Sequence, residues 1–244
     1  GNPEVDRPAG PIDPQVSVIR IDTKDGRPLG VVTNYALHTD TVSGTLYCAD
    51  YPGEISAVIK KVLGPEVVSL FMMGASGNIN HNDVLGIGKL GDVKKPFIHQ
   101  KIGRILAGEV LKVREKISVT EQLPIQAMRS ELTFQYRQPS QKEVEEAERA
   151  VRELSPDEVE WNFAQELLQA HANGEGTTTA EVQVIRIGDI AVAGLPSEIF
   201  VEFGLQIKEA SPFPMTLINE LCNGIPGTYL CTKEAYELGG YEPR

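Results

Sequence analysis

Residues 67–83, VVSLFMMGASGNINHND, pass abruptly from apolar to polar side chains. Residues 67–73 form a nearly continuous apolar run, which is the pattern of a central strand in an α/β sheet. Residues 74–82 are mostly small or carry amides, with one histidine among them. Because ligands of α/β proteins bind in the loops after the carboxyl ends of strands, this stretch predicts a buried strand that leads into a ligand-binding loop.

The rest of the chain alternates strand-like and helix-like segments around this stretch. Hairpins are expected over residues 15–37, with an Asp-Gly turn in KDGR, and over 180–196, with a turn at Gly188 and Asp189. Further strands are expected over 125–137 and 214–221, and helices over 51–66, 95–117, 140–154, 155–174, 198–210 and 232–240. Ser140 and Ser155 occupy the expected cap positions of two helices. The pattern predicts a single α/β domain, with a mixed sheet flanked by helices.

Size and charge limit the possible partners. The chain has 244 residues, 41% hydrophobic and 23% charged, and contains no apolar run long enough for a transmembrane helix. A net charge of −11 argues against nucleic acid as the main partner. The three cysteines, Cys48, Cys222 and Cys231, are irregularly spaced, so they are interpreted as buried or half-buried thiols and not as a disulfide framework or zinc ribbon.

The two ends of the chain suggest a fragment. The sequence begins without methionine, inside the Pro/Gly-rich stretch GNPEVDRPAGPIDP, and stops at GGYEPR, directly after a helix-like segment. No signal peptide is visible. We therefore expect the chain to be part of a longer protein, whose export the sequence does not decide.

Four other polar positions also follow predicted strands or open helices, and each has a structural alternative. His38 ends a strand, where imidazole is a common zinc ligand and Asp40 could fix its tautomer, but a lone histidine is more often structural. Asp50 precedes a helix and could simply cap it. Glu198 stands in a first helical turn, where acids offset the helix dipole, and Tyr229 could be an ordinary half-buried ring.

The order of these loops resembles the neutral/alkaline, non-lysosomal ceramidase family. The similarity rests on NYALHTDTVSG and ADYPGE, then GASGNIN, then IGDIAVAGLPSEIFVEFG, then LCNGIPGTYLCTKEAY and GGYE. It covers most of the chain and implies that residues 1–244 are a ceramidase-like catalytic domain without its N-terminal part. A largely helical segment, at about 139–175, matches only in general character.

The resemblance implies a zinc-dependent hydrolase that cleaves an amide (N-acyl) or ester bond. The family hydrolyses ceramide with zinc held by two histidines, a glutamate and a tyrosine. By motif, His38 matches the second zinc histidine, Glu198 the zinc glutamate of a PxE segment, and Tyr229 the zinc tyrosine. Asp50 falls on the aspartate of the family's SD or AD segment and is taken as a candidate catalytic residue of unassigned role.

This chain departs from the family pattern in two places. No histidine precedes His38, so the family's first zinc histidine, which lies upstream in an HTH motif, has no counterpart. The family's serine nucleophile lies in a G-[ND]-hydrophobic-S-P-N loop, whereas this chain reads GNINHN, with Asn80 at the serine and His81 at the proline. Asparagine is no acyl-transfer nucleophile, so Asn80 is expected to position water or an oxyanion, and His81 to act as acid, base or extra ligand.

Two functions follow from these departures. The first is a zinc hydrolase of a small-molecule or lipid-like substrate that need not be ceramide. The second is an altered or inactive family member that binds a lipid or a sugar in the former pocket. A purely structural module is disfavoured, because it does not explain polar residues gathered at successive strand ends. Family members are often exported or surface-associated, and the resemblance carries that expectation of a secreted or periplasmic protein to this chain.

Overall fold

The apolar stretches of the chain form a mixed α/β fold, seen in a computed structural model that describes residues 7–82, 97–224 and 227–243. The strands are β1 Ser17–Asp22, β2 Pro28–Tyr35, β3 Val68–Met73, β4 Ile125–Gln135, β5 Thr177–Ile187, β6 Ile190–Gly194, β7 Glu198–Ile199, β8 Met215–Asn219 and β9 Tyr229–Leu230. The helices are α1 Asp50–Leu63, α2 Ile98–Arg114, α3 Gln141–Glu153, α4 Val159–Asn173, α5 Val201–Ala210 and α6 Lys233–Leu238.

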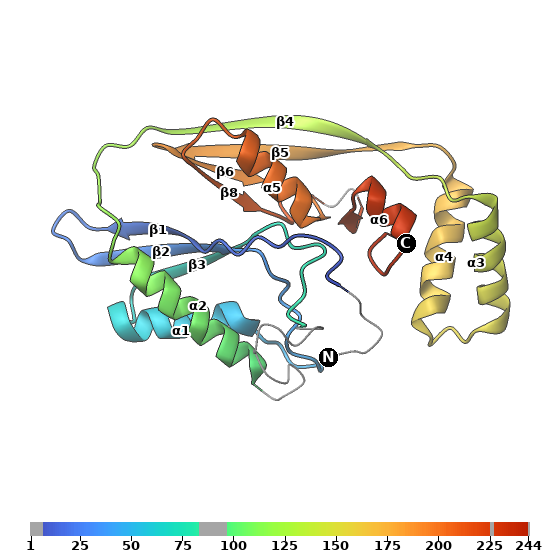
Figure 1. Cartoon of the computed structure of the whole chain (residues 1–244), viewed down its shortest axis with the longest axis horizontal. Helices are drawn as coiled ribbons and strands as arrows, with labels where there is room; N and C mark the ends of the chain where they lie inside the picture. The colour runs from blue at the N-terminus through green and yellow to red at the C-terminus, as the bar shows by residue number, and fades with distance from the viewer. Residues whose placement is uncertain (1–6, 83–96, 225–226, 244) are drawn as a thin grey trace.

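The N-terminal half is a three-stranded sheet covered by two helices. Its order is β1-β2-β3, with β1 antiparallel and β3 parallel to β2. The helices α1 and α2 pack together against it (Figure 1), and their apolar residues form the main core with the strands. Arg114, at the end of α2, forms a 2.7 Å ion pair with Asp22 of β1, and both side chains are almost fully buried.

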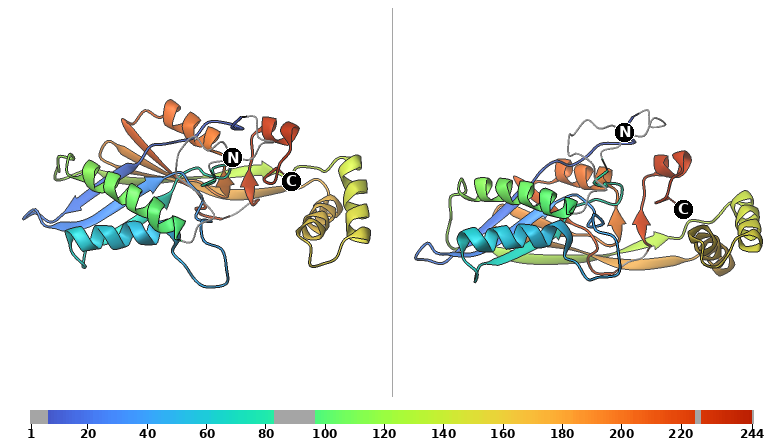
Figure 2. Two further views of the ribbon diagram at one scale, coloured as in Figure 1. Left: turned by 60° about the horizontal axis from the view of Figure 1, so that its bottom comes forward. Right: turned by 90° about the horizontal axis from the view of Figure 1, so that it is seen from below.

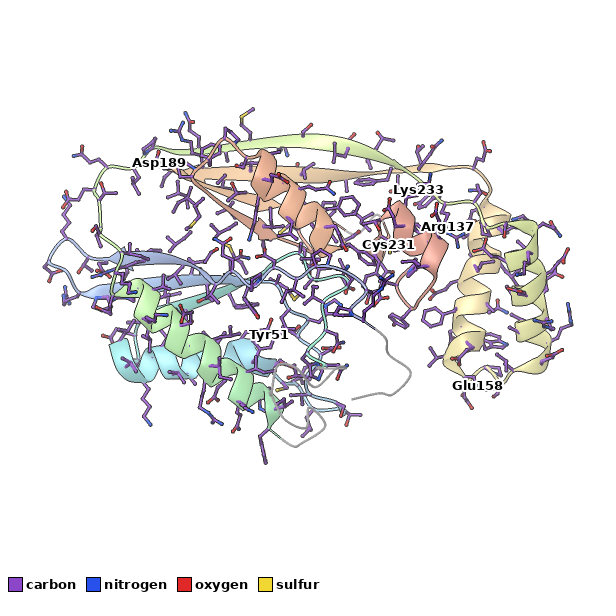
Figure 3. All side chains as sticks on the ribbon, in the orientation of Figure 1. Tyr51, Arg137, Glu158, Asp189, Cys231 and Lys233 are labelled. Carbon is purple, nitrogen blue, oxygen red and sulfur yellow. The ribbon has the colours of Figure 1, made fainter. Side chains whose placement is uncertain are left out.

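The C-terminal half is a four-stranded sheet that extends into a long arm. The order is β4-β5-β6-β8, with β6 and β8 parallel. Strands β4 and β5 run far beyond their neighbours, and α3 and α4 form a hairpin at their far end (Figures 1 and 2). Figure 3 labels Asp189 in the β5–β6 turn, at the opposite end of the arm from Glu158 of the helical hairpin.

The two sheets meet where their parallel strands end, and this junction positions the site. The side-chain amide of Asn34 on β2 donates to the carbonyl oxygens of Met72 on β3 and Ile218 on β8, at 2.9 and 2.7 Å. Backbone bonds then join the ends of β2, β3, β8 and β6 in turn: Gly74 N to Tyr35 O, Glu220 N to Met73 O, and Leu195 N to Asn219 O. The loops that follow these four strands are therefore neighbours.

The predicted fold class is confirmed. The chain is one α/β domain with both parallel and antiparallel pairs, flanked by helices, although the strands divide among three sheets. Both hairpins and all six helices form within a few residues of their predicted bounds. Lys95 and Pro96, at the predicted start of α2, lie outside the described residues. Among the described residues, no helix combines the length and apolar character needed to cross a membrane.

Two local predictions, the central position of β3 and the cap at Ser155, are wrong. β3 is a strand, but it lies at the edge of its sheet, with Val68 and Leu70 about half exposed. An apolar run does not distinguish a central strand from an edge strand whose second face is uncovered. Ser140 caps α3 in a capping box, whereas α4 begins after Glu158, because residues 155–158 first form a separate turn in which Ser155 N donates to the Glu158 carboxylate.

Glu198 does not open a helix as predicted. It lies on the two-residue strand β7, and α5 begins three residues later, at Val201. Because β7 pairs with β9 in parallel register, Glu198 is placed directly beside Tyr229. The cysteine interpretation also needs one correction, since Cys48 is exposed while Cys222 and Cys231 are half-buried.

Candidate functional site

His38 and Glu198 come together at the junction of the strand ends. His38 lies three residues after β2, and its backbone N–H donates to the carbonyl of Ile79 in the loop after β3, at 3.2 Å. Its Nε2 atom lies 3.5 Å from Oε2 of Glu198. The two side chains are 16% and 23% exposed, so they are largely buried and still accessible.

Tyr229 completes this group. The parallel pairing of β7 and β9 aligns it with Glu198, and its ring packs edge-on against His38, with centroids 6.4 Å apart and an interplanar angle of 64°. Burial, and then the carboxylate of Glu198, raise the pKa of the Tyr229 phenol above its ordinary value. The three residues predicted as metal ligands are thus neighbours, although Glu198 and Tyr229 follow His38 by about 160 and 190 positions in the chain.

The spacing of His38 and Glu198 fits a zinc ion. Zinc bonds of 2.0–2.2 Å in a tetrahedral arrangement separate two ligand atoms by about 3.4 Å, close to the 3.5 Å between His38 Nε2 and Glu198 Oε2. Among the described residues, no three histidine, cysteine, aspartate or glutamate side chains form a metal-binding group. Within the described part of the chain, the third protein ligand of a metal here would therefore be the Tyr229 phenol.

Asn80 and His81 form a second group around Asp40. Asp40 Oδ2 accepts a 2.8 Å hydrogen bond from the Asn80 amide, and Asp40 Oδ1 lies 3.2 Å from His81 Nδ1. A carboxylate that accepts from Nδ1–H leaves the Nε2 lone pair of the imidazole available as a base. The sequence analysis named Asp40 as the group that could fix the tautomer of His38, but the Asp40 carboxylate contacts His81 instead.

Asp50 is buried and occupied by hydrogen bonds. Its Oδ2 atom accepts from the backbone N–H groups of Thr41 and Val42, at 2.9 and 3.2 Å, and its Oδ1 atom accepts from the Thr41 hydroxyl and from Tyr51 N, both at 2.6 Å. It is the first residue of α1, with a φ of 49°, and not the residue before the helix. The Tyr51 hydroxyl (Figure 3) donates to Leu37 O at 2.5 Å, so both residues hold the segment around His38.

Glu220 is a buried carboxyl group that the sequence analysis missed. It directly follows β8 and is 3% exposed. Its carboxylate accepts hydrogen bonds from Ser76 N and Ile199 N, both at 3.1 Å, and from the Ser76 hydroxyl at 2.5 Å. Burial raises the pKa of Glu220 to about 7, although these hydrogen bonds oppose the shift. An acid placed directly after the apolar segment MTLIN was the signal available in the sequence.

The raised pKa of Glu220 predicts that stability falls as pH rises. The folded chain keeps this proton up to about pH 7, whereas the unfolded chain releases it near pH 4.5. Between pH 5 and pH 8 the free energy of unfolding is therefore expected to decrease by about 2–3 kcal/mol on account of this group. Nearby Tyr51 and Cys222 have raised pKa values and stay neutral over this range.

Urea unfolding at pH 5 and pH 8, with a chelator present, measures this decrease. Glu220→Gln is the comparison, because glutamine keeps an oxygen for the two N–H donors and cannot titrate. We expect the difference in unfolding free energy between the two proteins to change by about 2–3 kcal/mol over this interval. The same pH dependence in both would show that other groups cause it.

A pocket of about 450 Å³ lies beside the loop that follows β3. Asn80 and His81 are among the residues that line it, and most of its wall is apolar, from Leu37, Ile102 and Leu106 among others. A concave apolar surface with a few polar groups at its edge is the usual form of a small-molecule site. The pocket thus adjoins the histidine–aspartate pair through His81, and Leu37 in its wall directly precedes His38 in the chain.

Comparison with known proteins identifies the fold. Neither the protein-family models nor the curated proteins that were searched match this chain. The crystal structure of neutral ceramidase from Pseudomonas aeruginosa matches with a TM-score of 0.66 and 21% identity, over 95% of this chain and 43% of that one. A ceramidase complexed with C2 matches with a TM-score of 0.65 and 19% identity, over 95% and 44% of the two chains.

At this level of identity the likeness shows the fold, and the chain spans under half the length of the ceramidase structures it matches. The resemblance inferred from the order of the loops is therefore confirmed as a ceramidase-like fold. The predicted roles of His38, Glu198, Tyr229, Asn80, His81 and Asp50 stay predictions.

Proposed function

We propose that this chain carries part of the active site of a zinc-dependent hydrolase that cleaves an amide or ester bond, in a ceramidase-like catalytic domain that lacks the family's serine nucleophile. The observation that carries the proposal is the approach of His38 Nε2 to within 3.5 Å of Glu198 Oε2, with Tyr229 aligned beside the carboxylate. Its ceramidase-like fold supports the same reaction class, because ceramidases are hydrolases.

His38, Glu198 and Tyr229 would hold the zinc ion in this proposal. Zinc bound there would supply Lewis acidity and a water molecule whose pKa is lowered to about 7. These are three of the four zinc ligands that the resemblance implies, and this chain has no histidine before His38 to supply the fourth. The reaction then needs no serine, which fits the presence of asparagine at position 80.

His81 and Asn80 would act on the substrate. With Asp40 at Nδ1, His81 can accept a proton at Nε2 and return it to the leaving group. The second N–H of the Asn80 amide can donate to the carbonyl oxygen of the substrate as negative charge develops, a contact worth about 3–4 kcal/mol in the best cases. The apolar pocket beside them would bind the aliphatic part of a small-molecule or lipid-like substrate.

The metal content of the purified full-length protein, which contains this chain, tests this proposal first. Elemental analysis is expected to find about one zinc per chain in the parent protein and little in the His38→Ala variant, which loses an imidazole ligand. His171→Ala is the matched control, because His171 is an exposed residue of α4, and it should keep its zinc. A parent without zinc, or equal zinc in all three proteins, would contradict the proposal.

Activity on a panel of amides and esters separates hydrolysis from binding. Loss of turnover in Asn80→Ala and His81→Ala, with zinc retained, would support their assigned roles. Zinc without any turnover would favour the altered family member that binds a lipid or sugar in the same pocket.

A further inference from the structure

Glu220 links three segments that meet next to Glu198 of the candidate zinc site. Its carboxylate accepts from the loop after β3, through Ser76, and from β7, through Ile199 N. Its own backbone N–H donates to Met73 O at the end of β3. One buried side chain therefore fixes the ends of β3, β7 and β8 relative to one another.

Two further contacts carry this link to Glu198. Ile199 is the next residue along β7, and its carbonyl accepts a 2.8 Å hydrogen bond from Gly77 N in the loop after β3. Glu198 N donates to Thr228 O at 3.0 Å, just before Tyr229. With Ile199 held through both its N–H and its carbonyl, the backbone of Glu198 has little freedom to move away from His38.

Ser76 and Glu220 have the chemistry of a nucleophile and a base, but their position excludes that role. The hydroxyl lies 2.5 Å from the carboxylate, yet Ser76 has no exposed surface and Glu220 is only 3% exposed. A substrate cannot reach the serine oxygen without opening the junction of the strands. The pair is therefore built to hold the backbone and not to react.

We propose that Glu220 is a positioning residue that sets the zinc affinity of the site, by fixing the strand of Glu198 against the loop formed by residues 74–80. The proposal rests on the zinc site proposed above. Groups that orient metal ligands typically change metal affinity 10- to 100-fold when they are removed. Glu220 acts through the backbone of β7, so its effect should appear in zinc affinity as well as in stability.

Chelator competition measures the zinc dissociation constant in the parent protein, Glu220→Ala and Glu220→Gln. We expect about 10- to 100-fold weaker binding in Glu220→Ala. Glutamine can accept from both N–H donors with its oxygen and donate to the Ser76 hydroxyl with its amide, so Glu220→Gln should bind zinc nearly as well as the parent. Unchanged affinity in Glu220→Ala, or equal losses in both variants, would overturn the proposal.

A core variant distinguishes positioning from a general loss of stability. Ile59 is fully buried in α1, within the core of the N-terminal half. Ile59→Ala should lower the urea midpoint as Glu220→Ala does and still bind zinc with the affinity of the parent. If Ile59→Ala weakens zinc binding as much as Glu220→Ala, the role of Glu220 is merely structural.

Hydrogen exchange tests the link without any metal. In the metal-free protein, peptides that cover residues 74–80 and 197–201 should exchange faster in Glu220→Ala than in the parent or Glu220→Gln, because the N–H groups of Ser76 and Ile199 lose their acceptor. Unchanged exchange would overturn the positioning role by itself. A parent that binds no zinc would instead overturn the proposed function, and the effect on affinity with it.

Discussion

Replacing Gly77 by alanine is expected to lower the free energy of unfolding by about 3–4 kcal/mol and to abolish zinc binding. A Cβ atom at this position would lie 2.7 Å from Glu198 O and 2.9 Å from Ile199 C and O. These are backbone atoms of β7, which cannot swing aside as a flexible side chain can. The methyl group would push β7 away from the loop, break the bond from Gly77 N to Ile199 O, and displace Glu198.

Urea unfolding and zinc analysis of the same preparation measure both effects. Gly108→Ala is the matched control, since Gly108 lies within α2 and a Cβ atom there meets no other atom within 4 Å. That change should raise stability by up to about 1 kcal/mol, because alanine favours helix. If Gly77→Ala had the same urea midpoint as Gly108→Ala and kept its zinc, the close contact of Gly77 with β7 would be needed neither for stability nor for zinc binding.

Local patterns in the sequence predicted the longer elements, but not the two-residue strands β7 and β9. The Asp-Gly turn near residue 25, the Gly188–Asp189 turn and the cap at Ser140 all mark boundaries that the structure has. Such signals depend on neighbours in the chain, so a single sequence contains them. The polar loops could also be recognised locally, because each directly follows an apolar segment. The order of those loops indicated the ceramidase-like fold.

Contacts between distant segments were beyond the sequence. Asp40 lies 41 residues from His81, and Glu220 lies 144 residues from Ser76, yet each pair is in contact. The spacing of residues along the chain does not show that the ends of β3 and β8 are joined. That junction is what places Glu220 next to β7, which carries Glu198. The resemblance supplied His38, Glu198 and Tyr229 as a set, whereas the residues that hold them came only from the structure.

Replacing Asp50 by asparagine is expected to cost about 3 kcal/mol of stability and to reduce zinc retention. Each carboxylate oxygen accepts two hydrogen bonds: Oδ2 from the N–H groups of Thr41 and Val42, and Oδ1 from the Thr41 hydroxyl and Tyr51 N. An amide nitrogen in either position would face a backbone N–H donor, so one orientation is as poor as the other. Asparagine tolerates the φ of 49° at this residue, so the change isolates the hydrogen bonds from backbone strain.

The same variant decides between two roles for Asp50. A catalytic Asp50 would lose turnover on becoming asparagine while the unfolding midpoint and the zinc content stayed unchanged. A residue that positions the segment after His38 would lose stability and zinc together, and Asp189→Asn, an exposed turn residue on the long arm, should lose neither. We expect the second result, because all four hydrogen bonds to the Asp50 carboxylate come from the segment after His38 and from the first turn of α1.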